Sequence, residues 1–547
     1  MDTRAAAAIE RAGEGARATR AKSRTVVPTR TWCLYLHGHF LRSRLRARLD
    51  TRSNSPYLRE ILMRPNHGIV LLVCVSLVLP LHADHVKLAA TKTLPVTTSS
   101  AKARDLYEKA MSDYENLYLE RANLGWRAAT QADPNFALAQ AWIAFNSRTP
   151  AEASAAREKA KALTSKVTPG ERLMIQWITD VQENNFIAGI AAMNDMLAMY
   201  PKDKRLLYLA GNWLMVENGN QQAQKMFERA LVIDKKYPAA LNDLAYCYAR
   251  DREFAKAFGA MERYIAVLPT QPNPQDSYAE ILRMAGNFDP ALEHYRAALK
   301  IDPDFVSSQL GLGDTYALMG DQARARAEYD KAIQGAHTEA DRLDYRLQKA
   351  MTWVRENNFA EADRAFADVA EKAHAQGFEL EPAQAHRMMS VYQTDDASAL
   401  KHLEAAEDAL SHRASIAQSD REEERARILR CRAVRAAHAG DQELAGKTLQ
   451  QLETMANDSR SLVIQSAYHG AAGALLMGKQ KFADAIPHLE EDTDDPYSME
   501  LLSRAYSETG ASDKRHEIEA KLRSTNVPTL EQALVVPGAR ARRPESP

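Results

Sequence analysis

The sequence predicts an all-α solenoid in which pairs of antiparallel helices stack along one axis. The first observation is a repeat, since from Lys204 to Glu339 the chain repeats itself four times at a spacing of 34 residues. The second is that glycines fall where one helix would end and the next would begin. The third is composition, because the helix-favouring residues alanine, leucine, glutamate and arginine are abundant. A period of this length is typical of stacked helix pairs and not of a single globular core.

The register of the repeat is marked by residue size. A small residue occupies one position of every unit, at Gly211, Ala245, Ala279 and Gly313. A large residue occupies a later position, at Phe227, Met261, Tyr295 and Tyr329. A short side chain in the first helix lets the second helix approach closely, because a ridge then fits into a groove. The pattern resembles the tetratricopeptide repeat, whose unit is a helix A, a tight turn and a helix B. The resemblance implies a right-handed superhelical solenoid of helix-turn-helix units.

The turns carry the chemistry of helix ends. In four dipeptides a glycine suited to a left-handed helix end precedes a capping side chain: Gly219-Asn220, Gly286-Asn287, Gly320-Asp321 and Gly440-Asp441. Asn184-Asn185 and Asn357-Asn358 stand at equivalent places. Asp133-Pro134 and Asp302-Pro303 combine a capping carboxylate with a proline suited to a first helical turn, so we expect a helix to begin at each.

The same register continues, with slips, on both sides of the regular block. We therefore expect the solenoid to span residues 101–523, with its regular core at 204–339. Residues 84–100 are rich in threonine, serine and alanine and are expected to form a flexible linker. The unusually charged stretch from Ser411 to Arg430 indicates an exposed, extended helix. Arginines among prolines in residues 524–547 predict a disordered tail.

Residues 63–83 have the layout of a secretory signal peptide. One arginine precedes an apolar run from Ile69 to Leu81, and a small residue follows. The run is shorter than the roughly 20 apolar residues that span a bilayer comfortably. We therefore expect cleavage after Ala83 and a periplasmic or secreted protein.

Residues 1–62 are basic and show no repeat register. Two interpretations stay open. In the first, the segment is an over-extended start of the reading frame and translation begins at Met63. In the second, it is a disordered cytoplasmic tail, and residues 63–83 form a short, uncleaved inner-membrane anchor that leaves the solenoid outside the cytoplasm.

The formal net charge of −1 hides two regions of opposite sign. Residues 1–83 hold 14 Lys and Arg against 5 Asp and Glu, which leaves 57 against 67 and a net charge of −10 for residues 84–547. Nucleic-acid-binding proteins carry a basic patch or stripe, which this acidic body lacks. We therefore expect no nucleic-acid partner.

No spacing of residues predicts a catalytic, metal or cofactor site. Gly440 to Thr448 comes close to a phosphate-binding loop, but it has one residue too many between its glycines and lies where a turn and a helix B belong. Cys247 and Cys431 fall in distant repeats, so a disulfide is not expected, and Cys247 is expected to be a buried, inert thiol. These observations predict a protein that is not an enzyme and has no catalytic residues, metal ion or cofactor.

The resemblance implies that four positions of each helix A line a concave groove. In the regular block these are Arg205, Tyr208, Asn212 and Met215; Ala239, Asn242, Tyr246 and Ala249; Asn273, Asp276, Glu280 and Arg283; and Ser307, Leu310, Asp314 and Ala317. Tyr208 and Tyr246 are the candidate anchors for a partner, because buried aromatic rings dominate many interfaces. Packing between neighbouring helices is the alternative role of both rings.

Two functional hypotheses follow. The first is a non-catalytic protein–protein interaction scaffold or adaptor of the cell envelope, which holds a partner peptide or protein in the concave groove. The second is the sensory, extracytoplasmic part of a membrane-anchored signalling protein, and it depends on residues 1–62 being present. The residues do not specify the partner.

Overall fold

The computed structural model describes residues 93–216, 219–411 and 416–542, and within them it holds 25 α-helices and no strand. The predicted fold class, an all-α superhelical solenoid, is confirmed. The sequence expectations for the signal-like segment and for residues 1–62 lie outside the described residues. None of the described helices is both long and apolar enough to cross a bilayer.

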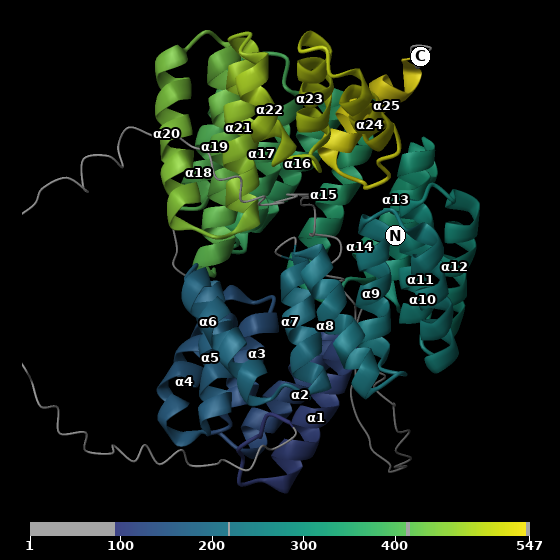
Figure 1. The fold of residues 1–547 in the computed structure, drawn as a ribbon, viewed down its shortest axis with the longest axis vertical. Helices are drawn as coiled ribbons and strands as arrows, with labels where there is room; N and C mark the ends of the chain where they lie inside the picture. The colour runs from purple at the N-terminus through teal and green to yellow at the C-terminus, as the bar shows by residue number, and fades with distance from the viewer. Residues whose placement is uncertain (1–92, 217–218, 412–415, 543–547) are drawn as a thin grey trace, which may run out of the picture.

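The helices form twelve consecutive pairs and a final single helix (Figure 1). Their bounds are α1 (Ala101–Glu115), α2 (Leu119–Ala132), α3 (Ala137–Asn146), α4 (Pro150–Ala162), α5 (Pro169–Gln182), α6 (Phe186–Met199), α7 (Lys204–Val216), α8 (Asn220–Ile233), α9 (Pro238–Arg250), α10 (Phe254–Val267), α11 (Asn273–Met284), α12 (Phe288–Ile301), α13 (Val306–Met319), α14 (Gln322–Gly335), α15 (Glu339–Arg355), α16 (Phe359–Ala375), α17 (Leu380–Tyr392), α18 (Asp396–Ala409), α19 (Gln418–His438), α20 (Gln442–Asp458), α21 (Leu462–Gly478), α22 (Phe482–Glu490), α23 (Pro496–Glu508), α24 (Ser512–Arg523) and α25 (Leu530–Ala541).

The predicted size pattern packs the two helices of a unit together. A Cβ atom added to Gly211 would lie 2.6 Å from the Phe227 ring, and one added to Gly313 would lie 2.7 Å from the Tyr329 ring. Real Cβ atoms do not approach so closely, so each glycine makes room for a ring of the paired helix. The four B helices of the regular block begin at the same point of each unit: Asn220, Phe254, Phe288 and Gln322.

The turn predictions are confirmed in part. Gly286, Gly320 and Gly440 adopt positive φ angles of 86°, 90° and 85°, and Asn184 and Asn357 also adopt the left-handed conformation. Gly219 is different, because its φ is −76° and it is the N-terminal cap of α8.

The prediction that helices begin at Asp133-Pro134 and Asp302-Pro303 is wrong. These residues form the turn after α2 and after α12, and the next helices start later, at Ala137 and Val306. The two carboxylates accept hydrogen bonds from the backbone N–H two residues on, at 3.0 and 3.1 Å. Each aspartate therefore shapes the turn instead of capping a helix.

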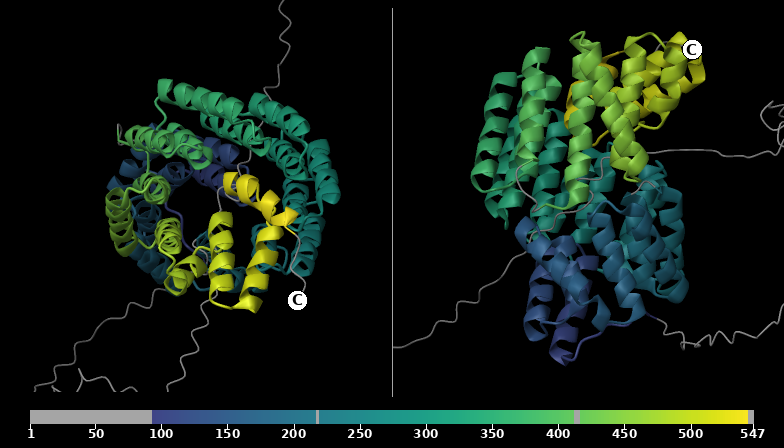
Figure 2. Two further views of the ribbon diagram at one scale, coloured as in Figure 1. Left: turned by 90° about the horizontal axis from the view of Figure 1, so that it is seen from above. Right: turned by 90° about the vertical axis from the view of Figure 1, so that its left-hand side faces the viewer.

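The solenoid winds through more than one superhelical turn. Seen from above, the helices form a ring, and α15 to α22 lie over the blue helices of the first pairs (Figure 2). α19 contacts α5, and Arg148 after α3 forms ion pairs with Asp344 at 2.7 Å and Asp341 at 3.6 Å in α15. Ser459 donates a hydrogen bond to Asn184 at 3.2 Å between the same two tiers. The second turn is thereby fastened to the first.

Three expectations for single segments do not agree with the structure. Part of the predicted linker is held in place, because the Leu94 N–H donates to Asp203 at 2.8 Å and the Thr97 N–H donates to Glu171 at 2.6 Å. The charged helix α19 is not exposed along its length, since Glu424 is fully buried and accepts a hydrogen bond from Arg387.

The third correction concerns the predicted tail. Residues 530–541 form α25, which packs on α15, α23 and α24. Its buried side chains include Leu530, Val535, Val536 and Ala539. The arginines and prolines of this stretch suggested disorder, but the apolar side chains between them give the helix a face to bury.

Candidate functional site

The residues predicted to line a groove are mostly buried. Eight of the ten principal candidates have little solvent exposure: Tyr208, Met215, Asn242, Tyr246, Asp276, Glu280, Arg283 and Asp314. Arg205 and Asn212 are intermediate. The Tyr208 ring packs against Phe227 and Tyr237, with centroids 6.2 and 5.9 Å apart. Packing between helices, the alternative role of these rings, is therefore what the geometry favours, and their role in partner binding stays a prediction.

The polar candidates form hydrogen bonds and ion pairs with one another along the stack of A helices. Asn212 donates to Asp243 at 2.9 Å, and the Tyr246 hydroxyl donates to Glu280 at 2.7 Å. Arg283 lies 3.1 Å from Glu280 and 3.6 Å from Asp314. Burial raises the pKa of Asp243 to about 6 and the pKa of Asp276 to about 7. The network joins successive repeats and leaves these groups turned toward their neighbours.

The first helix pair covers this inner face. Arg205 of α7 forms ion pairs with Glu108 and Glu115 of α1. Tyr118, which precedes α2, is 4% exposed, and its hydroxyl donates to Gln271 at 2.8 Å. Its ring meets Phe305 edge to face, with centroids 6.2 Å apart. The predicted groove is thus filled at one edge by the protein's own first turn.

An open cavity lies on the inner side of the second superhelical turn. Its volume is about 910 Å³, and α15, α17, α19, α20, α21, α23 and α25 contribute to its wall. Much of the lining is apolar, and three of its side chains are methionines. The apolar residues are Leu347, Met351, Met388, Val434, Leu475, Met477, Leu501 and Leu530. Methionine side chains adapt to irregular partners, so this wall suits an apolar segment. The volume lies at the upper end of the range for ligand pockets, about 300–1,000 Å³.

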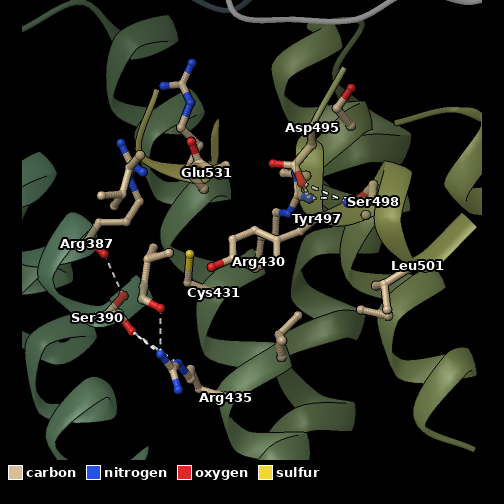
Figure 3. A pocket seen from close by; sticks show the side chains of 18 of the residues that line it. Arg387, Ser390, Arg430, Cys431, Arg435, Asp495, Tyr497, Ser498, Leu501 and Glu531 are labelled. Carbon is tan, nitrogen blue, oxygen red and sulfur yellow. Dashed lines mark hydrogen bonds and ion pairs between the residues drawn. The ribbon is translucent and has the colours of Figure 1, made fainter. Parts of the chain in front are cut away.

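Arginines from α17 and α19 frame the cavity (Figure 3). The Arg387 Nε donates to Glu424 at 2.6 Å, and Arg430 lies 2.8 Å from Asp492 and 3.1 Å from Asp495. Burial lowers the pKa of Arg387 while the Glu424 carboxylate raises it, and the result is a pKa above the ordinary value. Both guanidinium groups therefore stay charged and are held in fixed positions.

Arg435 fixes the other side of the cavity wall. It donates to the backbone carbonyl oxygens of Ser390, Val391 and Gln393, each at 2.8 Å. These carbonyls lie at the C-terminal end of α17, where the helix leaves acceptors unsatisfied. The arginine thus closes a helix end and ties α19 to α17.

Three polar groups of the cavity wall differ from these arginines in their contacts. Among the described residues, neither the Tyr497 hydroxyl nor the Glu531 carboxylate has a hydrogen-bond or ion-pair partner, and Cys431 is a free thiol. Figure 3 shows the Cys431 sulfur between the labelled arginines Arg387 and Arg430. Burial raises the pKa of the Cys431 thiol, which disfavours the nucleophilic thiolate. The arrangement offers apolar surface and hydrogen-bonding groups for binding.

Comparison with known proteins agrees with the repeat pattern. Residues 279–320, which contain the second half of α11, all of α12 and all of α13, match the family model described as "TPR repeat". This match identifies a TPR repeat in the chain. The matched region includes Ala279 and Gly313, the small positions of two units.

Beyond the TPR match, two curated relatives are similar over part of the chain. Protein O-mannosyl-transferase TMTC1 of Homo sapiens is 24% identical over 168 residues, which is 28% of this chain and 19% of the relative. The Mus musculus protein of the same name is 23% identical over 169 residues, or 28% of this chain and 18% of the relative. The chain thus spans about a fifth of the length of the curated relatives it matches.

Solved structures with TPR-like helix pairs are also similar. Yeast Tom70 is 14% identical with a TM-score of 0.38, covering 76% of this chain and 96% of Tom70. A chain of the APC/C complex Cut9-Hcn1 is 15% identical with a TM-score of 0.37, and the match covers 76% of this chain and 79% of that chain. A tetratricopeptide repeat protein of Parabacteroides merdae is 16% identical with a TM-score of 0.33, and the match covers 49% of this chain and 93% of that protein.

The cavity was not predicted from the sequence. Its wall joins side chains from seven helices between α15 and α25, and no short motif marks them. One signal was available, since Arg427, Arg430 and Arg435 follow one another at helical spacing in α19. No cluster of three or more metal-binding side chains occurs in the part of the chain that the structure describes.

Proposed function

We propose that this protein is a non-catalytic interaction scaffold of the cell envelope, and that the inner face of its second superhelical turn receives a segment of a partner protein. The observation that carries the proposal is the open cavity of about 910 Å³ beside α25. The inner face of the first turn is partly covered, because contacts of Tyr118 and Arg205 hold the first helix pair against it.

The chemistry of the cavity supports a protein partner. Apolar side chains such as Met351, Met388 and Leu501 supply contact area, and the Tyr497 hydroxyl supplies a hydrogen-bonding group with free capacity. Interfaces of this kind gain most of their affinity from a few buried anchors surrounded by a polar rim. The location in the envelope is supported by the signal-like residues 63–83, and mannosyl transfer is not part of the proposal because the similarity to TMTC1 covers only a fifth of that protein.

The test places a photo-crosslinking amino acid at Leu501, which lines the cavity, in the full chain in its native cells. The matched control carries the same amino acid at Val232, which is 81% exposed on α8 and lies outside the cavity. We expect a partner to be captured from Leu501 and not from Val232, and Met388→Arg, which fills the cavity, to abolish the capture. Capture from both sites, or capture that survives Met388→Arg, would place the interface elsewhere.

The alternative is the sensory part of a membrane-anchored signalling protein. It predicts that residues 1–62 are found in the mature protein by mass spectrometry and that the captured partner is another signalling chain. An N-terminus near Asp84 in the mature protein would exclude it and would support the exported scaffold.

A further inference from the structure

The last helix closes the inner face of the second turn. Leu530 belongs to the apolar cluster of α15 to α17, whereas Val535, Val536 and Ala539 belong to the cluster of α21 to α24. A single helix therefore joins two groups of side chains that the repeats themselves leave apart. Thr529, Leu530 and Glu531 also form part of the cavity wall. α25 therefore occupies the inner face in the way that a helix of a partner protein would.

Beneath α25 lies a partly buried arginine whose hydrogen bonds go to neutral acceptors. Arg355 of α15 donates to the Gln532 side-chain oxygen at 2.6 Å and to the Thr529 carbonyl oxygen at 3.3 Å. Among the described residues no carboxylate forms an ion pair with this guanidinium, and the Asp314 carboxylate favours its charge only from a greater distance. Burial lowers the pKa of Arg355 to about 10, so the charged form is held less favourably than in water.

A guanidinium in such a place normally pairs with a carboxylate. Hydrogen bonds between two charged groups are shorter and roughly twice as strong as bonds to neutral acceptors. The Gln532 amide has the shape of a glutamate side chain but not its charge. A helix that presented a carboxylate to Arg355 would therefore make a stronger contact than α25 makes.

We propose that α25 is a built-in occupant of this inner face, and that a partner helix with an apolar stripe and a carboxylate facing Arg355 displaces it. The inference rests on the proposed function, because it assigns the partner's chemistry to the same surface. A tethered helix competes at an effective concentration in the millimolar range, so a partner needs the additional charged contact to replace it. The displaced Glu531 would leave the cavity together with the helix.

Two peptides test the proposal by fluorescence anisotropy with the purified full chain. Both copy residues 528–541, and one has glutamate in place of Gln532. We expect the glutamate peptide to bind about tenfold more tightly than the native peptide. In the Arg355→Met chain, this difference between the peptides should vanish, because the cation that distinguishes them is gone.

The same glutamate placed in α25 itself should make the helix harder to displace. Gln532→Glu gives α25 the stronger contact with Arg355, so peptide binding should weaken at least tenfold. Ala541→Glu is the control, since it adds the same charge at an exposed position of the same helix. Equal binding of both peptides to the unmodified chain, or equal binding to the Gln532→Glu and Ala541→Glu chains, would overturn the proposal.

Cys431 provides a second measurement that does not depend on peptides. In a chain whose other three cysteines are replaced by serine, the rate of thiol labelling reports how often α25 leaves the cavity wall. Gln532→Glu should slow labelling and Arg355→Met should accelerate it, each severalfold. Displacement of α25 without capture at Leu501 would contradict the proposed function alone, and capture without displacement would contradict this inference alone.

Discussion

The hydroxyl of Tyr118 donates a hydrogen bond to the side-chain oxygen of Gln271, 2.8 Å away and 153 residues further along the chain. Tyr118 lies between α1 and α2, and Gln271 lies between α10 and α11. The contact brings the first helix pair onto the regular block. Together with the ion pairs of Arg205, it holds the first helix pair against the inner edge of that block.

Replacing Tyr118 by alanine should destabilise the protein by about 3–5 kcal/mol, because a buried ring and its contact with Phe305 are lost. Tyr118→Phe keeps the ring and loses only the hydrogen bond to Gln271, so its cost should be about 1 kcal/mol. Urea denaturation followed by circular dichroism measures both. Equal effects of the two substitutions would show that the ring adds nothing.

Gly211→Leu should cost roughly 1–3 kcal/mol by overpacking against Phe227. The control is Gly446→Ala in α20, where an added Cβ meets nothing within 4 Å. That substitution should stabilise the helix by about 0.5–1 kcal/mol. A melting temperature that stays unchanged in Gly211→Leu would contradict the packing of α7 against α8.

The ion pair between the two tiers can be removed by Arg148→Ala. Asp344 and Asp341 are 3% and 6% exposed, so losing their contacts with Arg148 should cost about 1–3 kcal/mol. Small-angle X-ray scattering should show a larger radius of gyration as the tiers separate. Arg324→Ala removes an exposed pair with Asp321 and should change stability by less than about 0.5 kcal/mol. Identical scattering for both variants would argue that other contacts hold the tiers.

A pair of histidines predicts loss of stability in mild acid. His469 and His488 face each other with their Nδ1 atoms 2.9 Å apart, and burial together with His488 lowers the pKa of His469 to about 4. The unfolded chain, with an ordinary histidine pKa near 6.5, binds more protons between these two values. The free energy of unfolding should therefore fall as pH falls from about 6.5 to about 4.

The measurement is the melting temperature at pH 7 and at pH 5 for the unmodified chain and for His469→Gln. The substitution keeps a polar side chain at the position but removes the titrating group. We expect the difference in melting temperature between the two pH values to be smaller in the variant. The same difference in both chains would show that the pair does not contribute.

The period and the turn residues predicted the stack of helix pairs well, because they reflect contacts between neighbours in the sequence. Gly211 and Phe227 lie in one unit, so their packing follows from the repeat itself. The ion pairs of Arg205 with Glu108 and Glu115 do not follow from it, because they join α7 to a helix about 90 residues earlier in the chain. Position in a helix predicted where these residues point, but not what covers them.

Charge and composition misled at two places for a related reason. The charged stretch of α19 pairs with residues of other helices, as Glu424 does with Arg387, so its charges did not indicate exposure. In residues 524–547 the arginines and prolines concealed the apolar spacing of Leu530 and Val536. Glu424 and the apolar face of α25 are buried by other helices, including α17 and α15.

The fastening of α15 to the turn after α3 limits how this architecture can grow. An open solenoid can gain or lose a repeat by duplication or deletion, and each remaining unit keeps its neighbours. Here one additional helix pair between α4 and α15 would rotate Asp344 around the superhelix axis, away from Arg148. The contact between Arg148 and Asp344 therefore fixes the number of helix pairs between these two residues. Short insertions in the turns should be tolerated there, whereas insertion of a whole helix pair should not.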